Sequence, residues 1–502
     1  MAPDGEALRR ENESLQRQVE QLRRQVGEQS KQLVRKQQQI ENAEKQIHDA
    51  QKQIHDLERQ LGLRQQNSTT SSKPPSSDGL AGQSRKRGRC KKNKSKRKPG
   101  GQPGHRGAHR QMEPPERVDE IRPVLPLHCR GCRHELPQQL DQISSTGPVR
   151  RHQVTELPPI RARIIEYQCH RVICPGCGET TRATVPEEAQ GQFGPQLTAL
   201  VAYLTVVCRM PRRVVEALLE QVLDIEISLG STQNCWEEAS EAVATVCKEL
   251  EQQLQDEPVL NIDETGWRTN GDKRYLWAFV AAHYIVYTVA VTRSSKVLIA
   301  MLGAVFRGIL CSDRFSGYLK YHQGQAQFCW AHLKRNFLGV LELSKSNEVE
   351  RFCRDVLAEH ARLFRLWRKF RGRQIDRGQL QMRSMKIEKR LFGLAERHLD
   401  SAHKDVRNLA NVLYFQLERL FVFVQREGVE PTNNSAERAL RTGVQWRKTS
   451  FGNRSATGEL ATARLLTVSE TCRLQRLNVL VYLSAAVDRF RRGQQPAPLL
   501  PR

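Results

Sequence analysis

The sequence lacks the long apolar runs of membrane proteins. Its longest such run, residues 197–208, is shorter than the about 20 residues that a membrane-spanning helix needs. The first residues, MAPDGEALRRE, contain no apolar signal core. Apolar residues make up 38% of the 502 residues, a low share for a wholly globular protein. We therefore expect a cytoplasmic protein, neither secreted nor membrane-bound, with part of its length in a solvated tail or a coiled coil.

Acidic residues are scarce, because 55 Asp and Glu face 80 Lys and Arg, which gives a net charge of +25. Residues 79–112 contain twelve Lys or Arg and no acidic residue, so this short segment carries about half of the excess. A strong positive charge favours a polyanionic partner, and nucleic acid is the most common one. Cations that neutralise DNA phosphates release counterions, which supplies affinity but little sequence recognition.

Residues 64–117 are predicted to form a disordered basic linker. The segment includes NSTTSSKPPSSDG, whose Ser, Thr and Pro can neither hold a helix nor build a core. A solvated linker without a partner is the alternative, but the charge favours contact with a DNA backbone. The cations expected to bind DNA here are Arg85, Lys86, Arg87, Lys91, Lys92, Lys96, Arg97 and Lys98.

The thirteen cysteines are odd in number and scattered, which argues against a disulfide framework. Four of them form the pairs CRGC and CPGC, and residues 154–173 between these pairs read as two strands around a turn. Four thiolates can hold zinc in a tetrahedron, as in a zinc ribbon. We predict a structural Zn²⁺ in a zinc-ribbon-like module over residues 118–190, with four reduced structural cysteines as the alternative. The expected ligands are Cys129, Cys132, Cys174 and Cys177.

Residues 8–61 carry a heptad pattern. Apolar residues recur at every seventh position, and many of them are β-branched, which favours a parallel two-stranded coiled coil. We predict that residues 1–63 form a coiled coil and that residues 8–61 join the chain into a homodimer or a larger oligomer. A single long solvated helix is the alternative. The repeating positions are Val19, Val26, Leu33, Ile40, Ile47, Ile54 and Leu61.

Residues 191–255 are predicted to form a helical, helix-turn-helix-like region that binds DNA. The run PRRVVEALLEQVL begins with Pro211, which suits a first helical turn, and Ser231 is placed to cap the next helix. Helices that are merely packed together are the alternative.

From Glu257 onward the sequence changes to short runs rich in β-branched and aromatic residues. PVLNID, YLWAFVAAHY and IVYTVAVT read as three strands, SSKVLIAML as a helix, and GILCSDRFSGY as a further strand. This is the order of an RNase H-like core, in which the first strand is central and the strand after the helix lies beside it in parallel. Asp263 and Asp313 would then stand at neighbouring strand ends, where two carboxylates can share divalent metal ions.

A third carboxylate is expected from a later helix, and Glu437 in PTNNSAERALR is the best candidate, with Asn434 as the helix cap. Three carboxylates can hold two Mg²⁺ or Mn²⁺ ions about 4 Å apart, which activate a water or a DNA 3′-hydroxyl and stabilise the leaving 3′-oxygen. The alternative is that both aspartates cap loops and that Glu437 belongs to a capping box.

Basic residues accompany these acids. In CWAHLKRNF, His332 is expected to approach the scissile phosphate, and the residues around Glu437 to contact the strand that is cut, with a solvated face as the alternative. We predict a catalytic domain over residues 256–455 with a helical insertion at about 335–430, and a C-terminal helical segment and tail over 456–502. The cations near Glu437 are Arg438, Arg441, Arg447, Lys448 and Arg454.

Several strings in this order carry a family resemblance: NSTTSSKPPSSDG with KPGGQPGHRG, the paired CxxC turns, IDETGWR, SDRFSGY, CWAHLKRNF, NNSAERALR and WRKTSFGNRSATGE. Along most of its length the sequence resembles the bacterial insertion sequence 66 family of DDE transposases. The resemblance implies a multidomain α+β protein with an RNase H-like core, whose three acids lie in the IDET, SD and AER motifs. By position these are Asp263, Asp313 and Glu437.

The same resemblance implies an activity and partners. Such a protein would bind the DNA ends of a mobile element, cleave DNA and transfer the 3′-hydroxyl end to target DNA, in a bacterial cytoplasm and associated with the nucleoid. Small accessory proteins of the same element are expected partners. A catalytically inactive, transposase-derived DNA-binding protein or regulator is the alternative.

Overall fold

The computed structural model of the chain describes residues 5–65, 104, 107, 111–143, 149–158, 160–322, 324–343 and 346–500. It combines helices with sheets, as the predicted α+β class requires. Two compact units are present, the larger formed from Met1–Ser84, Glu187–Pro211 and Asn234–Arg502, and the smaller from Arg85–Pro186 and Arg212–Gln233. Within the described ranges, every helix is too short or too polar to cross a membrane.

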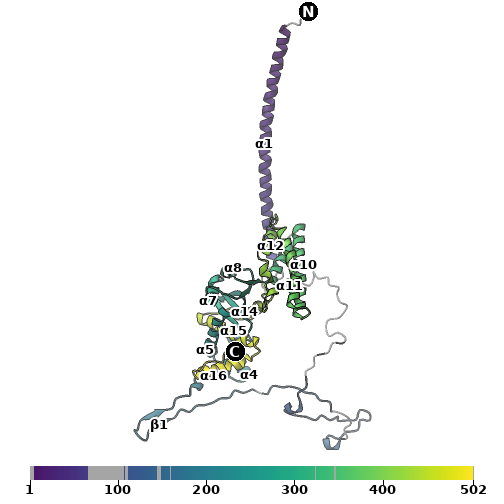
Figure 1. Cartoon of the computed structure of the whole chain (residues 1–502). Coiled ribbons are helices and arrows are strands. Elements are labelled where there is room, and N and C mark those ends of the chain that lie inside the picture. Colours follow the sequence, from purple (N-terminus) through teal and green to yellow (C-terminus); the bar gives the residue numbers. More distant parts are fainter. Residues whose placement is uncertain are drawn as a thin grey trace. The chain divides into compact units, whose positions relative to one another are not determined.

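Helix α1 (Gly5–Gln65) is one continuous helix of 61 residues, as the heptad pattern predicts (Figure 1). It contains no proline, and its many Gln, Glu, Lys and Arg residues are good helix formers. The apolar heptad residues are all exposed where their side chains are described, from Val19 to Ile47. The side chains of Ile54 and Leu61 lie outside the described part. The helix thus presents an uncovered apolar stripe.

The smaller unit contains a two-stranded antiparallel sheet of β1 (Arg171–Ile173) and β2 (Thr180–Arg182), together with helix α4 (Arg212–Leu223). The prediction of two strands over residues 154–173 is wrong, because only β1 forms there and it pairs with β2 across the second CxxC turn. The sequence gives a physical reason. Pro158 and Pro159 have no N–H to donate to a strand ladder. Short 3₁₀ turns lie at Pro115–Arg117 and Leu140–Gln142.

Helices precede the main sheet, as predicted, but their boundaries differ. They are α3 (Pro195–Val206), α5 (Leu229–Ala242) and α6 (Ala244–Gln253), with 3₁₀ turns at Glu187–Ala189 and Leu254–Asp256. Ser231 is not the cap, because α5 begins two residues earlier and the Oγ of Ser228 accepts the Ser231 N–H at 3.1 Å. The helix expected after Ser231 is also two helices, α5 and α6, which are separated at Val243.

The main sheet has five strands in the order β5-β4-β3-β6-β7. Strands β3, β4 and β5 are antiparallel neighbours, and β6 pairs with β3 in parallel after helix α7 (Ser295–Leu302). The first strand is therefore central and the strand after the helix lies beside it, as predicted. Strand β7 is parallel to β6 and was not predicted. The bounds are β3 Val259–Thr269, β4 Asp272–Val280, β5 Ile285–Ala290, β6 Ile309–Ser312 and β7 Ala326–Phe328.

Helices cover this sheet. Helix α14 (Asn434–Ser450) packs on β3 and β4, and Trp446 lies edge-on to Trp267 of β3 with 6.4 Å between the ring centroids. Helix α15 (Ala456–Leu474) packs along β5, where its Thr467 and Thr471 hydroxyls accept backbone N–H groups of the strand at 2.9 and 3.1 Å. Side chains thus satisfy an edge that would otherwise be open to pairing. Helix α16 (Val479–Arg491) packs against α3.

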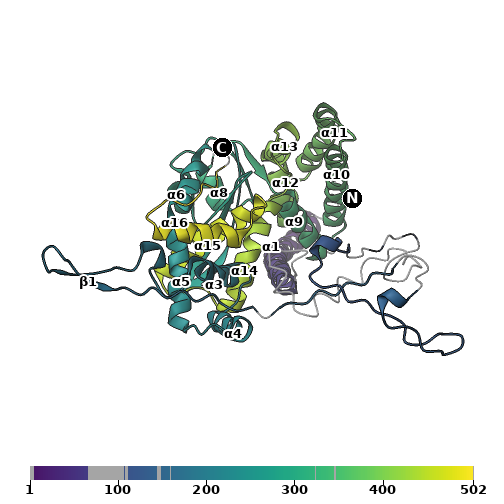
Figure 2. The same ribbon diagram turned by 90° about the horizontal axis from the view of Figure 1, so that it is seen from below.

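A second hydrophobic core lies in the helices between β7 and α14. Figure 2 shows α10, α11, α12 and α13 grouped together, and α13 also packs against β7. The long helical stretch predicted before the third acid is therefore present and has its own buried side chains, among them Phe352, Leu391 and Phe421. The elements are α8 Ser316–Tyr321, α9 Trp330–Leu343, α10 Asn347–Arg371, α11 Arg377–Glu396, α12 Lys404–Phe415 and α13 Glu418–Gln425.

Candidate active site

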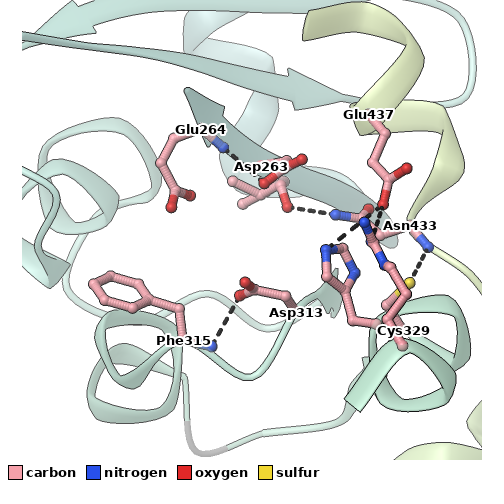
Figure 3. Close-up of polar contacts among 10 residues, drawn as sticks. Asp263, Glu264, Asp313, Phe315, Cys329, Asn433 and Glu437 are labelled. Carbon is pink, nitrogen blue, oxygen red and sulfur yellow. Dashed lines mark hydrogen bonds and ion pairs between the residues drawn. The ribbon is translucent and has the colours of Figure 1, made fainter. Parts of the chain in front are cut away.

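Three elements bring the predicted acids together. Asp263 lies within β3, Asp313 directly follows β6, and Glu437 lies in the first turn of α14. The prediction that Asp263 stands at a strand end is wrong, because β3 continues to Thr269 in its pairing with β4. The parallel register pairs Asn261 with Cys311, two residues before each aspartate, and so places the two acids side by side. Figure 3 shows the three carboxylates around one space. Residues separated by up to 174 positions in the sequence therefore form one acidic cluster.

Like charges and burial set the electrostatics of this cluster. Burial raises the pKa of Asp263 well above its usual range, and the carboxylates of Glu264, Asp313 and Glu437 raise it further. The N–H of Glu264 donates to Oδ1 of Asp263 at 3.0 Å, and this hydrogen bond lowers the pKa of Asp263. A buried carboxylate among like charges is stabilised by a proton or by a cation.

Local contacts hold the other two acids. Oδ1 of Asp313 accepts the N–H of Phe315 at 2.8 Å. Asp313 therefore also caps its loop, which was the alternative to a catalytic role. Oε1 of Glu437 accepts a hydrogen bond from Arg335 at 3.0 Å, and Nε2 of His332 lies 3.6 Å from the same oxygen. The capping-box alternative is not observed for Glu437, because its carboxylate faces these side chains.

Asn433 is a site residue that sequence reasoning missed. The prediction that Asn434 caps α14 is wrong, since Asn433 occupies the cap position and Asn434 is the first helical residue. Asn433 is 1% exposed, and its side-chain amide donates to the carbonyl of Ile262 at 2.7 Å rather than to its own helix. Its backbone N–H donates to Sγ of Cys329 at 3.1 Å. Asn433 therefore joins α14 to the residue before Asp263 and to the start of α9.

His332 and Arg335 lie on α9, which places both beside Glu437. Trp330 anchors the start of this helix, because its ring is buried and its Nε1 donates to the carbonyl of Leu420 at 2.7 Å. Burial lowers the pKa of His332, the nearby charge of Arg335 lowers it further, and Glu437 opposes both effects. The role of Arg335 was missed, although the sequence offers a signal in the basic pair that follows His332.

Glu264 is a second missed residue. Its side chain is 1% exposed and contacts both the guanidinium of Arg293 and the hydroxyl of Tyr318. The Arg293 guanidinium in turn lies 4.0 Å from the ring centroid of Phe315, whose N–H holds Asp313. The residue after Asp263 is thereby connected to the loop of the second acid. The sequence signal was the pair of consecutive acids in the strand. Neighbouring strand residues point to opposite faces, so Glu264 could be expected to need a partner on the face away from Asp263.

The predicted DNA-binding cations fall into three groups. Those from Arg85 to Lys98 lie outside the described residues. Arg438, Arg441 and Lys448 are exposed, and their spacing along α14 places them on one face of the helix, while Arg454 is exposed after it. Arg447 differs, because its guanidinium donates to the carbonyl of Gly266 in β3 and its pKa is lowered by burial.

The two CxxC turns have matching backbone geometry. In the first, the N–H of Cys129 donates to the backbone carbonyl of His134 at 2.8 Å. In the second, the N–H of Cys174 donates to the backbone carbonyl of Glu179 at 2.8 Å. Backbone N–H groups of the turns lower the pKa of both leading thiols. For Cys129 the largest effect comes from the N–H of Cys132, and for Cys174 from the N–H of Gly176. All four cysteines are described, yet no three of them lie together as a potential ligand group. The structure therefore shows two separate turns.

Comparison with known proteins gives matches over two parts of the chain. A model of the transposase IS66 family matches residues 190–460, and a family of unknown function (DUF6444) matches residues 1–111. The uncharacterized protein y4qI of Sinorhizobium fredii (strain NBRC 101917 / NGR234) is 28% identical over 204 residues, which cover 38% of this chain and 37% of that protein. The uncharacterized protein y4jD of the same strain is 24% identical over 234 residues, 43% of this chain and 44% of that protein. The chain spans less than half the length of these two curated relatives.

Proposed function

Since the chain belongs to the IS66 family of transposases, we propose that it is a DDE-type DNA transposase that binds the ends of an insertion sequence, cleaves DNA and transfers the 3′-hydroxyl end to target DNA. The observation that carries the proposal is the cluster of Asp263, Asp313 and Glu437 at the carboxyl side of the main sheet. The strand order with its central β3 and parallel β6 supports an RNase H-like core for residues 256–455.

The donor set of this cluster fits Mg²⁺ or Mn²⁺. Carboxylate oxygens are the ligands that these hard ions prefer, and Asp263 is a buried acid surrounded by other acids. The guanidinium of Arg335 is bonded to Glu437, whereas Asp263 and Asp313 accept hydrogen bonds from backbone N–H groups. Two bound ions would lower the pKa of a water or 3′-hydroxyl and stabilise charge on the reacting phosphate.

The side chains and backbone around the acids fix their positions before DNA binds. The N–H groups of Glu264 and Phe315 orient Asp263 and Asp313, and Arg335 orients Glu437. Carboxylates held in advance need no costly rearrangement during phosphoryl transfer. We assign His332, beside Glu437, to the approach of the scissile phosphate.

The exposed cations of α14 are proposed to bind the strand that is cut. Arg438, Arg441 and Lys448 project from the same helix as Glu437, so a phosphate backbone along this face would pass the acids. Arg454 would extend this surface. The basic segment with Arg85 to Lys98 and the helical region over 191–255 are proposed to bind DNA as well, the first without sequence preference.

Three further proposals concern metal and protein partners. The matching CxxC turns support a structural Zn²⁺ held by Cys129, Cys132, Cys174 and Cys177, which requires the two turns to come together. The exposed apolar stripe of α1 supports a homodimer or larger coiled coil. Accessory proteins of the same element and association with the bacterial nucleoid follow from the family alone.

Strand cleavage by purified full-length variants tests the proposed function. On DNA that carries the element ends, Asp263→Asn is expected to reduce Mg²⁺-dependent cleavage by more than about 100-fold, the upper range for groups that only orient metal ligands. Asp272→Asn is the matched control, since Asp272 is an exposed acid at the start of β4. Parent-level cleavage by Asp263→Asn would refute the assignment. A parent protein that binds DNA but never cleaves it would indicate an inactive DNA-binding derivative.

A further inference from the structure

A second group of potential metal ligands adjoins the acidic cluster. Cys329, His332 and Glu437 each offer one ligand atom, and these atoms lie within 4.8 Å of one another. Cys329 directly precedes α9, His332 lies in the first turn of that helix, and Glu437 lies in the first turn of α14. Figure 3 shows Cys329 and Glu437 on the same side of the site, with Asn433 between them and β3.

We propose that Cys329, His332 and Glu437 form a binding site for a thiophilic divalent cation of the zinc class, chemically different from the proposed Mg²⁺ ions. One thiolate, one imidazole and one carboxylate are a donor set that Zn²⁺ accepts, whereas Mg²⁺ does not favour thiolate or imidazole. The inference goes beyond the proposed DNA chemistry, because two of the three ligands, Cys329 and His332, lie outside the acidic cluster.

A backbone N–H group is directed at the sulfur of Cys329. Sγ of Cys329 accepts the N–H of Asn433 at 3.1 Å, and the pKa of Cys329 is raised by burial while N–H groups of Asn433 and His332 oppose that effect. Burial outweighs these N–H groups and holds the pKa of Cys329 at about 11, so the thiol would lose its proton when the cation binds, and the N–H of Asn433 would then face the thiolate. Both α9 and α14 begin at this place.

The imidazole also has an unused donor atom. Nδ1 of His332 is buried and has no hydrogen-bond partner, and the 3.6 Å between its Nε2 and Glu437 exceeds an ordinary hydrogen bond. A metal ion on Nδ1 would supply this missing contact, whereas an ion on Nε2 would leave Nδ1 without a partner. Cys329 is 3% exposed, but the side chains of His332 and Glu437 are 17% and 27% exposed, so the site has access to solvent for a fourth ligand.

Arg335 and the cation would share Glu437. The guanidinium donates to Oε1 of Glu437 at 3.0 Å, so a cation at this carboxylate must use the other oxygen or displace Arg335. Because Glu437 also belongs to the acidic cluster, a zinc-class cation held by Cys329 and His332 would compete with the Mg²⁺ ions proposed there.

Cobalt binding by the full-length chain tests the site, because a thiolate bound to Co²⁺ gives a charge-transfer absorption. The measurement uses a background of Cys129→Ser with Cys174→Ser, which removes the leading thiol of each CxxC turn. We expect Co²⁺ to give the thiolate absorption in this background, Cys329→Ser to abolish it, and His332→Gln to weaken binding at least about 10-fold. Cys353→Ser is the matched control, since Cys353 is a buried thiol of α10 outside this group.

An absence of thiolate absorption in the background, or its persistence after Cys329→Ser, would overturn the proposal. If Cys329→Ser fails to fold, as judged by circular dichroism, His332→Gln decides, and unchanged Co²⁺ affinity in that variant refutes the site. The readout needs no DNA and no cleavage, so failure of this site is distinguishable from failure of the proposed transposase activity.

Discussion

Mild acid should destabilise the helices between β7 and α14, because a buried histidine lies at their contact with α9. His360 of α10 stacks on Phe364 with 4.3 Å between ring centroids and lies 5.7 Å from the ring of Trp330. Burial, followed by the charge of Lys334, lowers the pKa of His360 to about 4. This ring supports the residue that anchors α9, the helix of His332 and Arg335.

The sign follows from proton linkage. In the unfolded chain a histidine has a pKa of about 6.5, so between pH 6.5 and 4 the unfolded state binds a proton that the folded state does not. The contribution of His360 to the free energy of unfolding is therefore intact above pH 6.5 and is lost as the pH falls toward 4. One pKa unit corresponds to about 1.4 kcal/mol, so at pH 4.5 the expected loss from this group is about 2.5 kcal/mol.

Urea unfolding at pH 7 and pH 4.5, followed by tryptophan fluorescence, measures this loss. His360→Phe keeps an aromatic ring for Phe364 and Trp330 but cannot titrate, so its stability should fall by about 2.5 kcal/mol less than that of the parent. His283→Gln changes an exposed histidine and should follow the parent. An equal pH dependence in His360→Phe and the parent would refute the reasoning.

Substitutions at three further positions test the contacts of the acids and the coiled coil. Asn433→Ala should cost about 1–3 kcal/mol in urea unfolding, because the buried carbonyl of Ile262 loses its partner, and it should also slow cleavage; a variant unchanged in both contradicts the positioning role. Arg335→Ala should reduce cleavage by about 10–100-fold and Arg335→Lys by less, whereas equal cleavage in the two variants would contradict an orienting charge. Ile40→Lys should lower the dimer fraction in analytical ultracentrifugation, while Gln38→Lys, outside the apolar stripe, should not; an unchanged dimer in Ile40→Lys would contradict the coiled coil.

The order of elements in the main sheet was accessible from the sequence because each strand carries a local signal. Alternating and β-branched runs identified β3, β4, β5 and β6, and the run SSKVLIAML identified α7. Asp263 and Asp313 could then be placed on neighbouring strands by topology alone, although the continuation of β3 past Asp263 could not be read from the run PVLNID. Glu437 could be proposed from its string and its order in the chain.

The contacts that hold these acids could not be derived in the same way. Arg335 and Glu437 are 102 positions apart, and Asn433 and Ile262 are 171 apart, so no periodicity connects them. The two asparagines before Glu437 are equally good caps by type, and only the packing of α14 on β3 decides which one is buried. Only one of the two strands expected over residues 154–173 is present in the described part of that range, where Pro158 has no N–H to donate to a strand ladder.

Ligation of a metal ion by Asp313 is the most direct test of the central claim that three acids act on DNA through divalent ions. The measurement is cleavage of element-end DNA by full-length Asp313→Cys with Mg²⁺ and with Mn²⁺, beside the parent, which should cleave with both. A thiolate is a poor ligand for Mg²⁺ and a better one for Mn²⁺, so the variant should be inactive with Mg²⁺ and regain part of its activity with Mn²⁺. Parent-level cleavage by Asp313→Cys with Mg²⁺, or no recovery of its cleavage with Mn²⁺, would contradict the binding of a metal ion by Asp313.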